Sequence, residues 1–160
     1  MESKLVPAAN IHLHTDAEQN VYPEKFDPRI IRAQEKYLEP VLGRVLYELL
    51  CEAFEAEAAT PSVVMPDRLD ELHTAMVPML SQWVFFLSLP FLSTSATNRA
   101  LETAPEAATG PGYNAYAAGV KTEAEDRTND LRKWLEARRA IYPELPTCPA
   151  KRRRTGGIVL

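Results

Sequence analysis

The sequence predicts a mainly α-helical protein: an antiparallel bundle of about four helices in a single domain, residues 1–160. Three observations support this prediction. The length of 160 residues suits one ordinary domain, and 46% of the residues are hydrophobic, which is enough for one core. Apolar residues recur at helical spacing in several long segments. Many of the 13 prolines fall at the boundaries of these segments.

The first two helices are expected within the predicted helical core, residues 26–143. Asp27 and Pro28 suit the cap and first position of a helix. Pro40 and Gly43 then predict a kink or short break. The apolar stripe before the break consists of Ile30, Gln34, Tyr37, Leu38 and Val41, and the stripe after it of Leu42, Val45, Leu46, Leu49, Leu50, Ala53 and Phe54.

The third helix is predicted to begin at Pro66, bend at Pro78 and end at Pro90. Its second half is apolar almost all round, which indicates burial on every side. That burial can occur within one chain or against neighbouring subunits. The candidates for a subunit interface are the aromatic residues of this helix and of the segment after it: Trp83, Phe85, Phe86, Phe91, Tyr113 and Tyr116.

The remaining segments are predicted to be a long loop, a last helix and two extended arms. Residues 93–118 are rich in Ser, Thr, Ala, Gly and Pro and are expected to form the loop. The last helix is expected from about Val120 to Tyr142, and three prolines after it favour an extended C-terminal arm, 144–160. The N-terminal arm, 1–25, contains an apolar–polar alternation at 11–14 that predicts one short strand.

The charge of the chain is unevenly distributed. Residues 1–150 contain 14 Lys and Arg against 22 Asp and Glu, a balance of −8, and the four basic residues 151–154 bring the net charge to −4. The N-terminus has no apolar signal region, and the apolar stretch Trp83–Leu92 is too short to span a bilayer. Cys51 and Cys148 suit two free thiols. We therefore expect a soluble, intracellular protein without a membrane partner.

No motif in the sequence points to catalysis, a metal or a cofactor. Metal-binding, phosphate-binding and nucleophile-elbow patterns are all missing from the sequence. His12 and His14 would share one side of a strand but have no third ligand, so surface positions are favoured. His73 lies on the apolar stripe of the third helix, which favours a hydrogen-bonded core histidine. The sequence therefore predicts a protein that is not an enzyme and has no cofactor.

The C-terminal arm carries the remaining candidate site: the basic run Lys151, Arg152, Arg153 and Arg154, followed by Ile158, Val159 and Leu160. A solvated tail is the simplest interpretation. The basic run could instead contact DNA phosphates without sequence specificity. A third interpretation is that the β-prone end adds to the sheet edge of another protein, with the basic run pairing to acidic groups.

Residues Phe26–Leu50 resemble the opening of small head–tail connector (adaptor, or neck) proteins of tailed phages. Their pattern is matched by Ile30, Ala33, Gln34, Leu38, Pro40, Leu42, Gly43, Leu46, Tyr47 and Leu50. The order of parts over residues 26–145, with Met76-Val77-Pro78 in the apolar helix, is also similar. The loop 93–118 departs from the family because it lacks an alternating hairpin pattern.

The resemblance implies a virion structural protein located in the neck and assembled in the host cytoplasm. By this resemblance, such a subunit joins a ring of twelve copies beneath the portal protein, around the genomic DNA, and binds a tail or head-closure protein. The resemblance also implies that the arms and long loop reach the portal or adjacent subunits, which makes a portal clamp the favoured role for residues 151–160. Another neck component, a small nucleic-acid-binding regulator and an unrecognised enzyme remain as alternatives.

Overall fold

The computed structural model describes residues 3–15, 23–60, 62–100 and 111–146, and the regular elements in these ranges are all helical. The prediction of a mainly α-helical protein is confirmed. The elements are the 3₁₀ helices η1 (Ala8–Leu13) and η2 (Pro23–Lys25), the π-helix η3 (Gln34–Leu38), and the α-helices α1 (Asp27–Ala33), α2 (Glu39–Leu42), α3 (Arg44–Ala59), α4 (Asp67–Ala100) and α5 (Pro111–Ala137).

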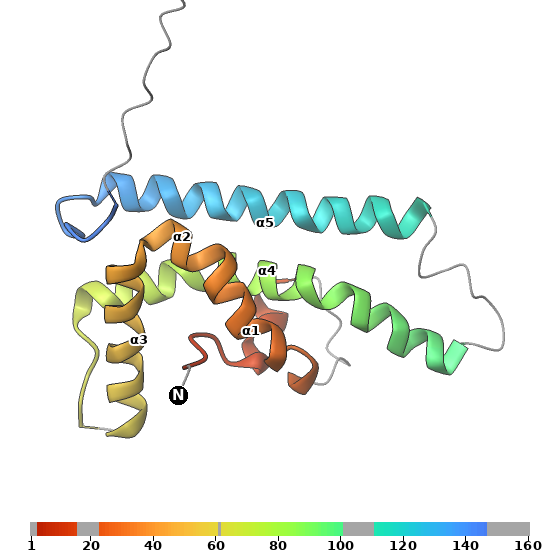
Figure 1. The fold of residues 1–160 in the computed structure, drawn as a ribbon, viewed down its shortest axis with the longest axis horizontal. Helices are drawn as coiled ribbons and strands as arrows, with labels where there is room; N and C mark the ends of the chain where they lie inside the picture. The colour runs from red at the N-terminus through yellow and green to blue at the C-terminus, as the bar shows by residue number, and fades with distance from the viewer. Residues whose placement is uncertain (1–2, 16–22, 61, 101–110, 147–160) are drawn as a thin grey trace, which may run out of the picture.

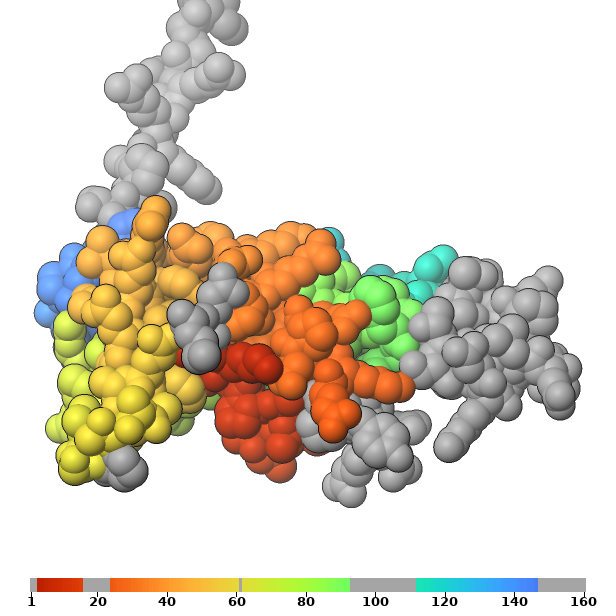
Figure 2. All heavy atoms as spheres, turned by 60° about the horizontal axis from the view of Figure 1, so that its bottom comes forward, coloured from red at the N-terminus to blue at the C-terminus, as the bar shows by residue number. Residues whose placement is uncertain are grey.

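The long helices α4 and α5 run antiparallel, and the shorter elements pack along α4 (Figure 1). Helix α4 contacts α5, α1, η1, η3 and α3, so it is the central element of the fold. In Figure 2, the side chains of the N-terminal segment and η1 (red) lie between α1 and α3. The predicted central role of the third helix follows from its apolar surface, which must be covered on several sides.

The first predicted helix is divided into α1, η3 and α2 because of Pro40. Proline has no N–H to donate, and its ring crowds the preceding turn of a regular α-helix. The preceding turn is widened into a π-helix, in which the Glu39 N–H bonds to the carbonyl of Gln34 five residues earlier. The predicted break at Gly43 is present, since Gly43 has φ +77° and joins α2 to α3.

The core is continuous from the N-terminal segment to the C-terminal turn. Trp83 is buried in this core, and its ring stacks on Tyr37 with centroids 3.6 Å apart. The Trp83 indole N–H donates to Thr128 Oγ1 at 2.8 Å, which ties α4 to α5. Other fully buried residues come from every part of the described chain: Leu5, Ile11, Phe26, Ile30, Leu38, Leu42, Leu46, Leu50, Leu72, Met76, Ala124 and Tyr142.

The prediction that Pro90 ends the third helix is wrong, because α4 passes through Pro78 and Pro90 and continues to Ala100. Helix α4 changes direction along its length (Figure 1). Residues on both sides of Pro90 are buried, as at Leu89, or half-buried, as at Leu92. Packing on both sides of a proline can offset the roughly 3 kcal/mol that it costs inside a helix.

The predicted loop 93–118 is also too long. Residues 93–100 belong to α4 and residues 111–118 to α5, so only 101–110 lie outside the described residues. Pro111 occupies the first helical position, where its missing N–H costs nothing, and the alanines after it favour a helix. The last helix therefore starts nine residues earlier than predicted, and it ends at Ala137 instead of Tyr142.

The short strand predicted at residues 11–14 is wrong, because η1 occupies Ala8–Leu13. Hydrogen bonds span three residues, from the Asn10 N–H to the Pro7 carbonyl and from the His14 N–H to the Ile11 carbonyl. Only Ile11 of this segment is buried, while Leu13 is exposed. The apolar–polar alternation at residues 11–14 therefore does not mark a strand. Only one of its two apolar residues, Ile11, faces the core from the 3₁₀ helix.

By length and composition, residues Asp67–Leu92 of α4 are sufficient to cross a membrane, and the most apolar 18-residue window within them has a mean hydropathy of 1.6. This span ends at the same residue as the apolar stretch Trp83–Leu92 recognised in the sequence, and it is longer because it also includes residues 67–82 of the helix. More than half of its most apolar window, 56%, is buried within the protein. A core helix of a soluble protein has the same properties, so the span is weak evidence for a membrane segment.

Candidate functional site

The described residues contain no cluster of three or more His, Cys, Asp or Glu side chains placed to hold a metal ion. His73 is hydrogen-bonded, as predicted: its Nε2 lies 2.6 Å from the carbonyl oxygen of Leu5, and its ring packs near Phe54. His12 packs edge-on against Phe26. The features with potential for binding are an uncharged tip, a groove between α4 and α5, and the start of the C-terminal arm.

The uncharged tip comprises residues 86–92 of α4 and 112–120 of α5, at the end of the helix pair away from α3 (Figure 1). Residues 72–98 and 107–120 contain no Asp, Glu, Lys or Arg. Phe91 is 51% exposed and Tyr116 is 47% exposed, and the guanidinium of Arg29 lies 3.8 Å from the centre of the Phe91 ring. Exposed aromatic residues and arginine are both enriched at the centre of protein interfaces.

The six interface candidates divide into two groups. Trp83 and Phe85 are only 5% and 3% exposed, because this chain already buries them. They therefore offer almost no surface to a second subunit. Phe86 and Tyr113 are half-buried, and Phe91 and Tyr116 are exposed, so the remaining four candidates lie at the uncharged tip.

The groove between α4 and α5 has a volume of about 490 Å³. Apolar side chains of both helices line it, including Met79, Leu131 and Trp134, and no described residue before Asp70 contributes to its lining. Acidic and basic groups surround these apolar residues: Asp70, Glu71, Asp130, Arg127 and Arg138. A groove with apolar and charged parts suits a peptide segment that carries both kinds of side chain.

Three of the five charged groups already have partners within the protein. Arg127 pairs with Glu123 at 3.6 Å, and Asp130 pairs with Lys133 at 3.2 Å. The guanidinium of Arg138 lies 4.4 Å from the centre of the Trp134 ring. Asp70 and Glu71 form no ion pair with a cation of the described chain. The groove therefore has an excess of unpaired negative charge at its Asp70–Glu71 end.

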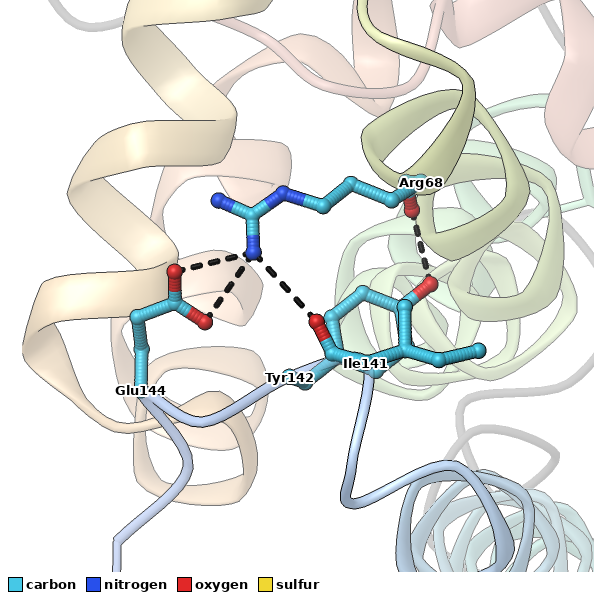
Figure 3. Close-up of polar contacts among 4 residues, drawn as sticks. All are labelled: Arg68, Ile141, Tyr142 and Glu144. Atoms are coloured by element: carbon cyan, nitrogen blue, oxygen red, sulfur yellow. Dashed lines mark hydrogen bonds and ion pairs between the residues drawn. The ribbon is translucent and has the colours of Figure 1, made fainter.

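The start of the C-terminal arm is fixed by contacts with α4 (Figure 3). Arg68 Nη1 donates to Glu144 Oε1 at 2.9 Å and to the Ile141 carbonyl at 3.4 Å. The buried Tyr142 donates its hydroxyl to the Arg68 carbonyl at 2.7 Å. We call these contacts the C-terminal clasp.

Electrostatics at the clasp favour an ionised Glu144. Desolvation by burial acts to raise the pKa of Glu144, but a hydrogen bond from its own backbone and the hydrogen bond and charge of Arg68 lower it below the ordinary value of 4.5. Burial raises the pKa of the Tyr142 phenol, with a further increase from the charge of Glu71. Glu144 therefore remains a carboxylate, and Tyr142 a hydrogen-bond donor, at neutral pH.

Gly43 allows the end of the described chain to pack against the junction of α2 and α3. A Cβ atom at Gly43 would lie 2.8 Å from Pro146 Cδ, closer than real Cβ contacts allow. Arg139 Nη2 donates to the Pro146 carbonyl at 3.0 Å. The point from which residues 147–160 continue is therefore held by the junction of α2 and α3 and by Arg139 in the turn after α5.

The N-terminal segment is held by the buried side chain of Gln34. Its Oε1 accepts the Leu5 N–H at 2.9 Å, and its Nε2 donates to the Ser3 carbonyl at 3.0 Å and to the Tyr47 hydroxyl at 3.2 Å. Burial raises the pKa of Tyr47 to about 12, so this hydroxyl stays protonated. Sequence reasoning placed Gln34 in an apolar stripe, where a polar residue is a signal for a buried hydrogen-bonding role.

The arm residues predicted as a contact site, Lys151–Arg154 and Ile158–Leu160, lie outside the described residues, as does Cys148. Cys51 is a half-buried free thiol whose pKa is raised by burial. The sequence did not reveal the clasp, because Arg68 and Glu144 are far apart in the chain and nothing in their local pattern connects them. It also did not reveal the groove, whose two sides come from different helices.

Comparisons with known proteins identify a family but no characterised relative. Neither the curated proteins nor the solved structures include a match to the chain. Residues 38–155 match the model of a family described as a family of unknown function, DUF6712. This match covers the second half of the connector-like segment, α3, α4, α5 and the clasp. Because it extends over well more than half of the 160 residues, the chain belongs to the DUF6712 family.

Proposed function

We propose that the protein is a structural subunit of a tailed-phage head–tail connector, which assembles as a ring between the portal and the tail. The observation that carries this proposal is the connector-like pattern of residues 26–50. Most of its positions are buried, including Ile30, Ala33, Gln34, Leu38, Leu42, Leu46 and Leu50. The resemblance therefore lies in residues that determine packing, and such residues are informative about a shared fold.

The remaining positions of the pattern have definite structural roles. Pro40 lies just after the π-helix Gln34–Leu38. Gly43 leaves room for the ring of Pro146, and the Tyr47 hydroxyl accepts a hydrogen bond from the side-chain amide of Gln34. Their roles link the N-terminal segment and the C-terminal clasp to the first helices. A pattern that positions both arms suits a subunit whose arms contact neighbouring proteins.

The uncharged tip supports assembly of several copies. Clusters of exposed aromatic residues on the surface of a monomer are typical of regions that another protein covers. The rest of the body is acidic, which suits a channel that DNA passes through without adhering. The basic arm is proposed to clamp onto the portal, and a tail or head-closure protein is the proposed partner on the opposite side.

The first test is the mass of the purified protein in solution, measured by light scattering after size-exclusion chromatography. Twelve copies of the 17.9 kDa chain, the number that the resemblance implies, would give about 215 kDa. Negative-stain images should then show a ring with a central channel. A protein that stays monomeric and adds no mass to the portal ring of its own phage would contradict the proposal.

The contribution of the uncharged tip is tested with Phe91→Glu and Tyr116→Glu. Each places a charge where the proposed interface excludes it, so each should shift the mass towards that of the monomer. Val64→Glu is the matched control, because Val64 is exposed in the connection between α3 and α4, away from the tip. Equal loss of assembly in all three variants would argue against the tip as the interface.

A further inference from the structure

We propose that the groove between α4 and α5 binds the protein's own C-terminal segment, residues 147–160. The groove combines an apolar surface, from Met79, Leu131 and Trp134, with the carboxylates of Asp70 and Glu71. These two carboxylates form no ion pair with any cation of the described chain. A suitable occupant is therefore a peptide that is basic in one part and apolar in another.

The C-terminal segment has this chemistry. Lys151–Arg154 supplies four positive charges, and Ile158–Leu160 supplies three consecutive apolar side chains. The four charges complement Asp70 and Glu71, and the apolar end complements the surface around Trp134. The arginines can also form bidentate hydrogen bonds with carboxylates, which strengthens such pairing.

The position where the segment begins places it beside the groove. The Pro146 carbonyl is bound by Arg139, and the neighbouring residue Arg138 lines the groove. Fourteen extended residues reach about 46–50 Å, whereas the part of α5 beside the groove, from Arg127 to the helix end at Ala137, is only about 15 Å long. The segment is thus long enough to turn back and lie along the whole groove.

Tethering favours the segment of the same chain over that of another copy. A short flexible tether gives an effective concentration on the order of millimolar, so weak contacts are sufficient for occupancy. Binding in this way would keep the basic residues from DNA or a partner protein until that partner competes for them. Occupancy of the groove requires neither a ring nor a portal, so it can be tested separately from the connector function.

The test is zero-length carbodiimide coupling of the full-length protein, followed by mass spectrometry. This chemistry joins a carboxylate to an amine only when the two are in contact, and Lys151 has the only side-chain amine in residues 147–160. We expect a cross-link from Lys151 to Asp70 or Glu71 in the monomer fraction. The yield should fall several-fold when salt is raised to about 1 M, because salt screens such pairs.

The variant Asp70→Asn/Glu71→Gln should lose this cross-link while its circular dichroism spectrum remains that of the wild type. The matched control is Glu52→Gln/Glu55→Gln, which removes two carboxylates from the exposed face of α3 and should leave the Lys151 cross-link unchanged. Cross-links scattered over all surface carboxylates, or none from Lys151, would overturn the proposal. Cross-links found only between two chains would contradict the proposal, because they would show that the groove binds the C-terminal segment of a second copy.

Discussion

Gln34 connects three parts of the molecule through one buried amide. It accepts the Leu5 N–H and donates to Ser3 and Tyr47, so its loss would leave a buried N–H and a partly buried carbonyl without partners. An unsatisfied buried polar group costs about 1–3 kcal/mol, which is more than a typical hydrogen bond contributes. The attachment of the N-terminal segment therefore depends on this residue.

Gln34→Leu should lower the free energy of unfolding by about 2–4 kcal/mol, because leucine keeps the volume but leaves these groups unpaired. Urea unfolding followed by circular dichroism measures the change. Glu35→Gln is the control, since the neighbouring Glu35 side chain is exposed and should give a change near zero. A Gln34→Leu variant as stable as the wild type would show that water replaces the lost hydrogen bonds.

Gly43→Ala should destabilise the protein by at least about 1 kcal/mol, because φ is +77° and the new Cβ would collide with Pro146. Gly112→Ala is the matched control: Gly112 lies inside α5, a Cβ there meets nothing within 4 Å, and alanine favours a helix. Thermal unfolding should therefore show opposite shifts for the two variants. Shifts of the same sign would contradict the role given to Gly43.

At the scale of the elements, α4 determines the core through contacts with helices before and after it. Trp83→Ala should lower the free energy of unfolding by about 3–5 kcal/mol, since it removes the stacking on Tyr37 and the hydrogen bond to Thr128. Leu46→Ala should cost about 2–5 kcal/mol for the loss of a fully buried side chain. Chemical denaturation measures both values, and unchanged stability would show that these positions are not core.

The clasp between α4 and the C-terminal turn should make stability depend on pH. The pKa of Glu144 is lowered on folding, so its contribution is fully present above the unfolded value of about 4.5 and is lost as pH falls through the folded value. Glu144→Gln should cost about 0.5–1 kcal/mol at neutral pH, because the Arg68–Glu144 pair is only partly exposed. Urea unfolding at several pH values should show this difference disappearing in acid.

The control for the clasp is Glu48→Gln, which removes the more exposed ion pair between Arg44 and Glu48 on α3. Its effect should be smaller than that of Glu144→Gln at neutral pH, because exposed ion pairs contribute little. A Glu144→Gln difference that stays constant from neutral to acidic pH would show that the charge of Glu144 is not what stabilises the clasp.

The elements also show which features a sequence can predict. The helices around Leu46 and Leu131 were predictable because each has one apolar stripe. Pro90 was misleading, since the cost of a proline is local whereas the packing that offsets it comes from other elements. The clasp and the groove were not predictable, because Arg68 and Glu144 meet only after the chain folds.

For the whole molecule, the described core within residues 3–146 should not need the end of the chain. Deleting residues 150–160 should preserve the helical spectrum and change the free energy of unfolding by less than about 0.5 kcal/mol. The same deletion should weaken binding to the proposed partner ring, measured by co-sedimentation. Loss of cooperative unfolding would show that the deleted residues belong to the core, and full binding would contradict the clamp role.

The π-helix Gln34–Leu38 has a rotational consequence for the whole chain. Successive residues of an α-helix are about 100° apart, so removing one residue from this turn would rotate everything after it by about that angle. Tyr47 would turn away from Gln34, and Gly43 would no longer face Pro146. The single widened turn therefore fixes the rotation about the helix axis between Gln34, which holds the N-terminal segment, and Gly43, which packs against the start of the C-terminal arm.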